Sequence, residues 1–542
     1  MIVIIPIGGT GQRFKDNGYK QPKALINIYG KPIISYLLDN LNTDNIDYIF
    51  IPYNKEYKPY RFEDFLIKSY SKINFRFFCL ENNTRGAAET INIGINNLNE
   101  EREIPVLCLD CDSFYTCDII SQWNGENCIF SFQDVNENPI YSYIKTNENN
   151  EIIDIKEKEK ISNNACSGAY GFCSINELKK YTSKIIEENI TQKSEFYTSG
   201  VIKKMISEGV IYKKIVIEKK HFVQLGVPND VDKFKTYLII ENINTNQKLT
   251  TDIKGHSNFD INIININNNK FLCKSSNNYA DSIRLNNQIE KQQIHGKLFK
   301  FNIPNIIFKS HIVNNRQYFL MNYLNNSENI FNYIINNNYL VIENIFIFIK
   351  NIIDIYIDNS IYKKLDKVII SDKIDSIKRN IENINKNNFF DKEEYNFLIN
   401  KINILKNDIE KICNIYIPVG YCHGDLTLSN MLLNTIDNNI YLIDFLDSFI
   451  ETPLFDIIKI RQDTELFWSL NMITTNIDKN KIKIILKYLD KKIDNYFQKY
   501  DFYKDKIYDY FKIINLLRVL QYCNNKDIKK FLMKYLNYRL DI

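Results

Sequence analysis

Short apolar runs alternate with stretches of helical spacing from the start of the chain to about residue 235. Such β-branched and aromatic runs, bounded by turn residues, predict buried strands. The expected strands are MIVIIPI (1–7), DYIFIPY (47–53), FRFFCL (75–80) and VLCLDCD (106–112). PIISYLLDNL and AAETINIGINNL, which lie between them, predict helices. The alternation indicates an α/β, Rossmann-like domain with a mostly parallel sheet, whose ligands bind at the carboxyl ends of the strands.

The pattern changes in ENINTNQKLTTDIKGHSN (241–258), which loses its apolar periodicity and is typical of a linker. FDINIININNNKFLCKSS then predicts a hairpin with NNN as its turn. From about residue 326 the chain is mostly helical, apart from a second hairpin-like stretch, NMLLNTIDNNIYLIDF. We therefore expect a first domain over residues 1–238, a linker over 239–254, a small β-rich lobe over 255–325 and a helical lobe over 326–542.

Composition narrows the class of protein. The chain has 542 residues, 44% hydrophobic and 25% charged, which suits a soluble protein of two or three domains. The net charge of +4 gives no reason to expect nucleic acid or a membrane surface as partner. The most apolar window, 339–357, contains Glu343, Lys350 and Asp354, so a buried helix is favoured over a membrane span. A cytoplasmic protein is expected, and a homo-oligomer is left open.

The eleven cysteines are scattered, and only Cys108 and Cys111 have C-x-x-C spacing. No second pair follows at the distance that zinc ligands require. Buried free thiols are therefore favoured over a zinc site or a redox pair.

Two motifs near the start contain glycine and basic residues suited to binding phosphate groups. GGTGQRF (8–14) follows the first strand directly, and QPKALI (21–26) comes shortly afterwards. Gly8, Gly9 and Gly11 would let backbone N–H groups approach a triphosphate closely. Arg13 and Lys23 would then neutralise phosphate charge as catalytic residues. A plain Rossmann-like domain that binds another nucleotide through GGTG is the alternative.

The pattern G-G-x-G-x-R-F … P-K-x-L resembles the sugar-phosphate nucleotidyltransferase family. The resemblance extends through NTRGAAET, LCLDCDSF, EKEKISNNACSGAYGF, EFY and QLGVPND, and so over nearly all of residues 1–235. It implies that Gly86 and Ala87 contact the nucleobase and that Asp112 binds Mg²⁺, with Asp110 as the back-up ligand. It also implies that the pair Glu157 and Lys158 contacts the phosphate and sugar of the acceptor.

One departure from the family pattern concerns the metal. Many relatives carry a second metal-binding aspartate before the G-T/V-P turn, where this chain has Gln224 and Leu225. Glutamine is a poorer ligand for a hard cation than a carboxylate. The ion would therefore depend on Asp112 and the substrate phosphates, or Asp230 would supply the missing ligand.

A second set of residues for phosphoryl transfer lies in VGYCHGDLTLSNMLLN (419–434) and the following YLIDF. Transfer of a phosphoryl group to an alcohol needs a carboxylate near the hydroxyl and oxygen ligands for Mg²⁺. Asp425 is placed for the first role, and Asn430 and Asp444 for the second. His423 is expected to brace the loop by hydrogen bonding rather than to carry protons.

H-G-D-x-x-x-x-N followed by I-D-F resembles the aminoglycoside phosphotransferase and choline kinase family. The resemblance implies a two-lobed, protein-kinase-like α+β fold with Mg²⁺ and with ATP as phosphate donor. In the small lobe it makes Lys274 the candidate for the α- and β-phosphates and Glu290 its partner. YFLMNYL (318–324) resembles the hinge that contacts adenine, and PLFDIIKIRQD (453–463) the helix after the magnesium segment.

The two resemblances together suggest one pathway, because a kinase makes the phosphate monoester that a nucleotidyltransferase consumes. We expect a bifunctional enzyme that phosphorylates a small alcohol or sugar and transfers a nucleotidyl group to it from CTP or another NTP. Its product would serve in decorating a surface polysaccharide or lipid. Two alternatives remain: a choline or ethanolamine kinase fused to a phosphocholine-type cytidylyltransferase, and an active transferase carrying a kinase-like scaffold. Antibiotic resistance is disfavoured, since it leaves the transferase unexplained.

Overall fold

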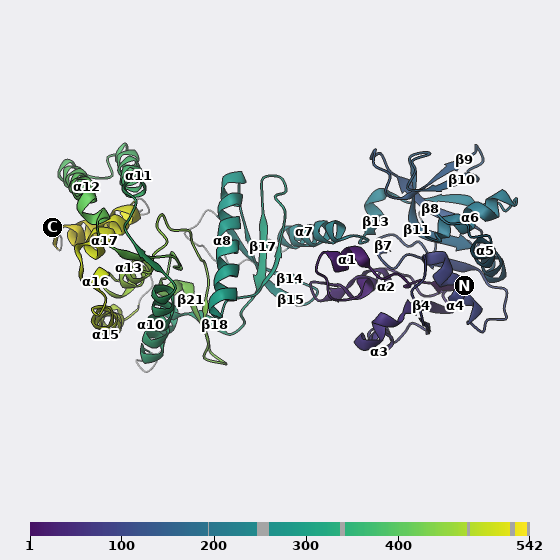
Figure 1. The fold of residues 1–542 in the computed structure, drawn as a ribbon, viewed down its shortest axis with the longest axis horizontal. Coiled ribbons are helices and arrows are strands. Elements are labelled where there is room, and N and C mark those ends of the chain that lie inside the picture. Colours follow the sequence, from purple (N-terminus) through teal and green to yellow (C-terminus); the bar gives the residue numbers. More distant parts are fainter. Residues whose placement is uncertain (193, 246–258, 337–341, 474–476, 521–525, 539–542) are drawn as a thin grey trace. The chain divides into compact units, whose positions relative to one another are not determined.

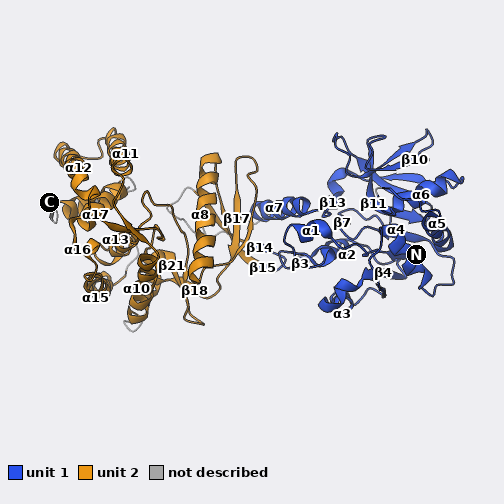
Figure 2. Cartoon of the chain, in the orientation of Figure 1, with its two compact units in different colours: residues 1–248, 265–269 blue, residues 249–264, 270–542 orange. Residues whose placement is uncertain are grey.

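The first strand, β1 (Ile2–Ile4), lies at the centre of the largest sheet and pairs in parallel with β4 and β6. In the computed structural model, the described residues are 1–192, 194–245, 259–336, 342–473, 477–520 and 526–538. They form two compact units, residues 1–248 with 265–269 and residues 249–264 with 270–542 (Figure 2).

The sheet of the first unit runs in the order β10-β9-β11-β6-β1-β4-β5, and β12 and β8 continue it from β11. β5, β4, β1 and β6 are parallel, whereas β11 is antiparallel to its neighbours. The strands are β4 (Tyr48–Asn54), β5 (Phe75–Leu80), β6 (Val106–Leu109), β8 (Cys128–Gln133), β9 (Ser142–Thr146), β10 (Ile152–Glu157), β11 (Asn164–Phe172) and β12 (Lys213–Val216). The predicted α/β fold is confirmed, and the strands expected from residues 1–112 form its parallel part.

Helices cover this sheet because its buried strands carry apolar side chains on both faces. Ile2 and Ile4 pack in one core with Ile91 and Ile95 of a neighbouring helix. The helices are α1 (Gln12–Asp16), α2 (Ile33–Leu38), α3 (Phe62–Ser69), α4 (Ala87–Asn96), α5 (Ile175–Glu187), α6 (Thr198–Ser207) and α7 (Pro228–Thr245). α4, α5 and α6 contact one another (Figure 1). Because α7 continues to Thr245, the first part of the expected linker is helical, and residues 246–258 lie outside the described residues.

The second unit begins with a four-stranded sheet in the order β14-β15-β17-β16. Its strands are β14 (Asp260–Ile266), β15 (Asn269–Ser275), β16 (Ile306–Lys309) and β17 (Tyr318–Asn322). Asn267 and Asn268, at the turn of the predicted hairpin and within the stretch 265–269 that counts with the first unit, both have positive φ, as a type I′ turn requires. Helix α8 (Tyr279–Phe299) packs Leu285 and Ile289 onto this sheet, beside β17 in Figure 1.

The rest of the second unit is helical around one large apolar core. Its longer helices are α10 (Ile342–Asp358), α11 (Lys367–Asn385), α12 (Lys392–Cys413), α13 (Pro453–Thr464), α15 (Lys479–Phe497), α17 (Lys506–Val519) and α18 (Lys526–Tyr538). The short elements are β18 (Ser327–Asn329), α9 (Ile330–Asn336), β19 (Ile361–Lys363), β20 (Ile417–Val419), α14 (Trp468–Met472) and α16 (Asp501–Lys504). The second predicted hairpin consists of β21 (Met431–Asn434) and β22 (Ile440–Leu442).

α13 is the central helix of this part, since it contacts α10, α14, α15 and α17. All of its residues are buried, although Asp456, Lys459, Arg461 and Asp463 are ionisable. Buried charges are retained only when they are paired or hydrogen-bonded. The sites described below show what their partners are. No helix in the described part of the chain has the length and apolar character needed to cross a membrane.

Core packing in the second unit should depend on which face of α10 a residue occupies. Ile349 is fully buried, whereas Ile347 on the same helix is 49% exposed. We expect Ile349→Ala to lower the unfolding free energy by about 2–5 kcal/mol and Ile347→Ala by less than about 0.5 kcal/mol. The chain's only tryptophans are Trp123, in the first unit, and Trp468, in the second. Urea unfolding of a Trp123→Phe background, followed by Trp468 fluorescence, therefore measures the second unit, and equal losses would contradict the assignment.

Acid should destabilise the second unit through His295 of α8. Its Nδ1 lies 2.8 Å from the Tyr356 hydroxyl, and burial lowers the pKa of the imidazole to about 3. Below its ordinary pKa of about 6.5, the unfolded chain takes up a proton that the folded chain does not. Stability should therefore fall as the pH drops from about 6.5 towards 4, by up to about 1.4 kcal/mol per pH unit. His295→Gln should flatten that slope in urea unfolding, and the same change at exposed His311 should not.

Candidate functional sites

The glycine turn after β1 is held against β4 and α4. The amide of Asn54 donates to the Gly8 carbonyl over 3.2 Å, and a Cβ added at Gly8 would lie 2.0 Å from the Thr90 hydroxyl oxygen. Gly11 has a φ of 62° and caps α1, where any side chain would be strained. Gly9, in contrast, has no atom within 4 Å of an added Cβ. The turn is thus fixed at both ends and open at Gly9.

Lys23 and Asp112 meet across this site. Lys23 begins a 3₁₀ turn (Lys23–Leu25), Asp112 follows the end of β6, and the ammonium forms an ion pair with the carboxylate. Burial acts to lower the pKa of Lys23, but the charge and hydrogen bond of Asp112, together with the nearby Cys111 and Asp110, outweigh it and the pKa is raised. Asp110 is near both groups, and burial raises its pKa well above the ordinary range. The predicted residues 23 and 112 are therefore in direct contact.

Arg13 lies on α1 with its side chain exposed. Among the described residues, no carboxylate forms an ion pair with it. Its charge acts on the Tyr197 hydroxyl, which indicates that the two side chains are near each other. A guanidinium held near a glycine turn without a counter-ion is suited to bind a phosphate.

The segment of Gln224 and Leu225, where the family resemblance would place a second metal-binding aspartate, packs against Asp112. The Leu225 N–H donates to the Asp112 carbonyl over 2.7 Å, and a Cβ added at Gly226 would lie 2.9 Å from Asp112 Oδ2. Gln224 ends a short strand paired with Ser113. Asp230 lies in the first turn of α7; burial raises its pKa, and repulsion from Asp112 adds to the rise. The structure thus brings Gln224 and Asp230 towards Asp112.

The donor chemistry here fits Mg²⁺. This ion is usually held by one or two carboxylates, with water and substrate phosphates supplying the other ligands. Asp112 provides one carboxylate, and Asp110 lies beside it. In the described part of the chain, no group of three or more His, Cys, Asp and Glu side chains forms a complete metal cage. A site completed by substrate phosphates is what such a donor set supports.

The expected base-contacting loop is tied to the segment before α6. The Phe196 N–H donates to the Arg85 carbonyl and the Ala88 N–H donates to the Phe196 carbonyl, over 2.8 and 3.0 Å. Gly86 has a φ of 147°, and a Cβ there would lie 2.4 Å from the Phe196 carbonyl oxygen. Ala87 begins α4 and is half-buried. Only glycine fits at 86.

The acceptor pair, Glu157 and Lys158, lies at the end of β10. Glu157 accepts hydrogen bonds from the hydroxyls of Ser142 and Ser199, the latter over 3.1 Å. Lys158 Nζ donates to the Tyr197 hydroxyl over 3.1 Å and lies 3.9 Å from Glu157. Sequence reasoning missed both serines. The T-S-G that follows the flagged EFY motif was the available signal for Ser199.

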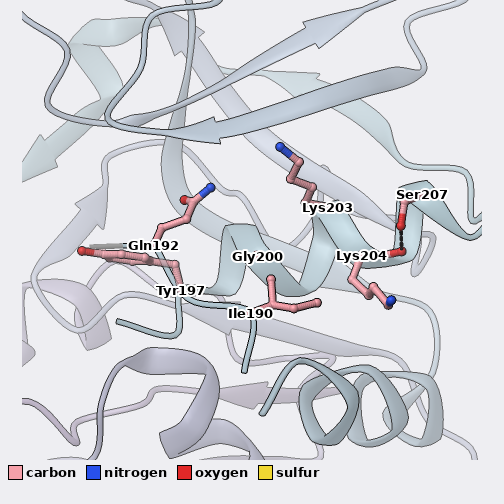
Figure 3. A pocket seen from close by; sticks show the side chains of 7 residues that line it. All are labelled: Ile190, Gln192, Tyr197, Gly200, Lys203, Lys204 and Ser207. Atoms are coloured by element: carbon pink, nitrogen blue, oxygen red, sulfur yellow. Dashed lines mark hydrogen bonds between the residues drawn. The ribbon is translucent and has the colours of Figure 1, made fainter. Parts of the chain in front are cut away.

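A cavity of about 290 Å³ begins at Tyr197. Figure 3 shows it along α6. Its lining residues are Ile190, Gln192, Tyr197, Gly200, Lys203, Lys204 and Ser207. Since Tyr197 also contacts Lys158, the cavity adjoins the expected acceptor side.

In the second unit, Lys274 of β15 meets Asp444. Its Nζ lies 3.0 Å from Asp444 Oδ1 and 3.1 Å from Gln288 Oε1, and 4.8 Å from the centre of the Phe259 ring. Asp444 itself has a φ of 60°, a strained conformation for a residue other than glycine. The predicted residues 274 and 444 are therefore brought together.

The expected pairing of Lys274 with Glu290 is not what the structure has. Glu290 is 54% exposed and contacts Lys309 at 3.8 Å and Asn286 at 2.7 Å. Gln288, two residues earlier on α8, takes its place. Residues two apart lie on different faces of a helix, so only one of them can face Lys274.

Asp425 has two partners that orient it. Lys459 Nζ lies 2.6 Å from Asp425 Oδ1, and the Asn430 amide donates to Oδ2 over 3.0 Å. Burial acts to raise the pKa of Asp425, but Lys459 outweighs it and the pKa is lowered. With the Asn430 nitrogen so engaged, its amide oxygen is the atom suited to bind Mg²⁺, as expected for a ligand.

His423 braces the loop, as expected from the sequence. Its Nε2 lies 2.9 Å from the Ile443 carbonyl, and its Nδ1 accepts from the Asp425 N–H over 3.3 Å. Burial lowers the pKa of His423 to about 4, so the ring is neutral near pH 7. It also packs against Phe445 at 4.3 Å between ring centres.

Two further aspartates of α13 support this loop, and sequence reasoning did not single them out. Asp456 accepts from the N–H groups of His423 and Gly424 over 2.6 and 2.9 Å. Asp463 accepts from the Leu428 N–H over 3.0 Å. Both stand in PLFDIIKIRQD, where their position in an apolar helix was the available signal. These bonds explain how α13 holds buried carboxylates.

Gly86→Ala should damage the first site through backbone strain. The added methyl group overlaps the Phe196 carbonyl, so the 85–88 loop must move. We expect a loss of about 1–3 kcal/mol in the unfolding free energy, measured through Trp123 fluorescence in a Trp468→Phe background. Gly200→Ala is the matched control, because no atom lies within 4 Å of a Cβ there. Equal stability of both variants would contradict the close approach.

Comparisons with known proteins match part of this chain. Residues 2–230 match the nucleotidyl transferase family model. The bifunctional protein GlmU of Methanocaldococcus jannaschii is 24% identical over 259 residues, which cover 47% of this chain and 57% of that protein. The chain thus spans little more than half the length of that relative.

Several solved structures are similar to part of this chain. A nucleoside-diphosphate-sugar pyrophosphorylase from Vibrio cholerae RC9 has 20% identity and a TM-score of 0.39, covering 44% of this chain and 100% of that one. The inositol-1-phosphate CTP transferase from T. maritima has 14% identity and a TM-score of 0.36, covering 42% and 90%. The family match, together with the geometry at Lys23 and Asp112, supports the conclusion that residues 2–230 form a nucleotidyl transferase domain.

Proposed function

We propose that this chain is a bifunctional enzyme. Its second unit phosphorylates a small alcohol or sugar, and its first unit transfers a nucleotidyl group from an NTP to that phosphate. The observation that supports this most directly is that each unit brings a lysine onto the aspartate expected to hold Mg²⁺: Lys23 onto Asp112, and Lys274 onto Asp444. A cation at each carboxylate is what a polyphosphate site needs.

In the first unit, an oxygen of the acceptor phosphate attacks the α-phosphorus of the NTP, and the bond to the β-phosphate breaks to release pyrophosphate. Mg²⁺, when bound, supplies charge neutralisation at the phosphates. Lys23 and Arg13 add positive charge where the transition state gains negative charge. Gly86 and Ala87 let the backbone approach the base, and Lys158 takes the acceptor phosphate.

In the second unit, the hydroxyl oxygen of the acceptor attacks the γ-phosphorus of ATP, and ADP leaves. Asp425 accepts the hydroxyl proton, while Lys459 and Asn430 keep its carboxylate ionised and oriented. Lys274 contacts the α- and β-phosphates, and Asn430 and Asp444 are the residues that would hold Mg²⁺. Gln288 supports Lys274 in place of the expected glutamate.

Two sequence segments bear on the identity of the acceptor. Segments NTRGAAET and EKEKIS look more like those of sugar-handling relatives, which favours a sugar or polyol phosphate over phosphocholine. Activated donors of this kind serve in decorating surface polysaccharides or lipids. The alternative that the second unit only acts as a scaffold is disfavoured by the full set of contacts around Asp425.

Two variants separate the two activities. Asp425→Asn should lower ADP release by a factor on the order of 10²–10⁴ and leave pyrophosphate release unchanged when a phosphorylated acceptor is supplied. Lys23→Met should lower pyrophosphate release by a factor on the order of 10²–10³ and leave ADP release unchanged. The assay contains ATP, each of CTP, UTP, GTP and dTTP, and sugar, polyol and amino-alcohol acceptors.

Asp437→Asn and Lys20→Met, at exposed positions of the same units, serve as controls and should change neither activity. If Asp425→Asn has no effect on ADP release, the kinase step fails and the scaffold reading gains support. If no NTP yields pyrophosphate with any phosphorylated acceptor, the transferase step fails.

A further inference from the structure

Positive charge gathers beyond Asp425, on the side formed by three helices. Lys459 of α13 contacts Asp425 directly. Arg518 of α17 and Lys373 of α11 are the other two members, and α17 contacts both α11 and α13. We call Lys373, Lys459 and Arg518 the cationic cluster.

Aromatic contacts and helix spacing show that these side chains converge. Phe455 precedes Lys459 by four residues on α13, and Phe511 precedes Arg518 by seven on α17, so each pair shares one face of its helix. The rings of Phe455 and Phe511 lie 5.0 Å apart. Further along the same faces, the Asn515 amide donates to Gln462 over 2.9 Å.

Phe449, in the segment after Asp444, completes the arrangement. Its ring centre lies 4.9 Å from that of Phe455 and 5.4 Å from Lys373 Nζ. Lys373 is thereby directed to the junction of α11, α13 and α17. Mutual repulsion agrees with this geometry: burial lowers the pKa of Lys373, and the charges of Arg518 and Lys459 lower it further.

The cluster has more cations than carboxylates. Lys459 is neutralised by Asp425, but within the described ranges neither Lys373 nor Arg518 has a carboxylate within ion-pair distance. Arg518 donates to the Asn515 side chain over 3.2 Å. Asp463, a further carboxylate of α13, is engaged with the Leu428 N–H and Ser469. Half-buried cations without counter-ions are costly unless an anion binds them.

We propose that the alcohol phosphorylated at Asp425 carries an anionic group, a carboxylate or a phosphate, that binds Lys373 and Arg518. This inference rests on the proposed kinase function and specifies its acceptor class. It disfavours choline, ethanolamine and aminoglycosides, because their positive charge would be repelled by the cluster. It also means that the product, before nucleotidyl transfer, carries two anionic groups.

Lys373 and Arg518 act in binding rather than in proton transfer, since Asp425 is already oriented by Lys459 and Asn430. Their removal should therefore affect KM for the acceptor more than kcat. A carboxylate and a phosphate would both bind these two cations. Matched acceptors can distinguish between the two anionic groups.

The test uses the full-length protein, ATP and two acceptor series: glycerol, glycerate and glycerol 3-phosphate, and glucose, gluconate and glucose 6-phosphate. Choline and ethanolamine form the cationic arm, and ADP release is measured. We expect kcat/KM to be at least about 10-fold higher for an anionic member than for its neutral counterpart. Whether the carboxylate or the phosphate member is preferred identifies the source of the anionic group.

Lys373→Gln and Arg518→Gln should each raise KM for the preferred acceptor about 10-fold, with kcat little changed and with the neutral counterpart unaffected. Lys378→Gln is the matched control on α11, because Lys378 contacts Glu382 at 3.9 Å. Inorganic phosphate should inhibit the unmodified protein competitively against the acceptor, a readout that does not depend on the folding of any variant.

The outcomes separate the two proposals. Preference for a neutral or cationic acceptor, or absence of competition by phosphate, contradicts the proposal of an anionic acceptor. Neither result contradicts the proposed kinase function. Absence of ADP release with every compound overturns the kinase function, and the acceptor class with it. Equal KM effects from Lys373→Gln and Lys378→Gln would show that the cationic cluster is not part of the acceptor-binding site.

Discussion

The contact between a lysine ammonium and an aspartate carboxylate is the interaction on which both sites depend. It occurs between Lys23 and Asp112, between Lys274 and Asp444, and between Lys459 and Asp425. Each pair joins segments far apart in the sequence, and each is at least partly buried, where charge interactions exceed those in water. In each pair the lysine holds the carboxylate in position and balances its charge.

These pairs differ in what they leave for a ligand. Under the proposed function, Lys23 and Lys274 contact the aspartates that would hold Mg²⁺, so nucleotide binding would redistribute these contacts. Lys459 differs because it lowers the pKa of Asp425, the proton acceptor of the proposed reaction, and is itself buried on α13. The neighbouring cations Lys373 and Arg518 are proposed to bind the anionic group of the acceptor. Under the proposed function, the same kind of contact would serve phosphate binding, proton transfer and acceptor selection.

Local packing explains why the loops carrying these residues hold their shape. Gly86 can approach the Phe196 backbone only because it lacks a Cβ. Asp456 holds the N–H groups of His423 and Gly424, and the neutral His423 holds the Ile443 carbonyl. Backbone groups that no helix or strand satisfies are thereby bonded by buried side chains.

The sequence alone determined the α/β order of the first unit, both hairpins of the second, and the residues of each motif, because these follow from periodicity and from short-range spacing. It could not determine which residues meet across long separations. Gln288 rather than Glu290 faces Lys274 because the rotation of α8 against the sheet decides it. The serines at Glu157, the buried aspartates of α13 and the convergence of Lys373 with Arg518 likewise required the packing of distant elements. Tertiary structure decided them because contact between side chains depends on how helices and strands are oriented, and no local pattern encodes that.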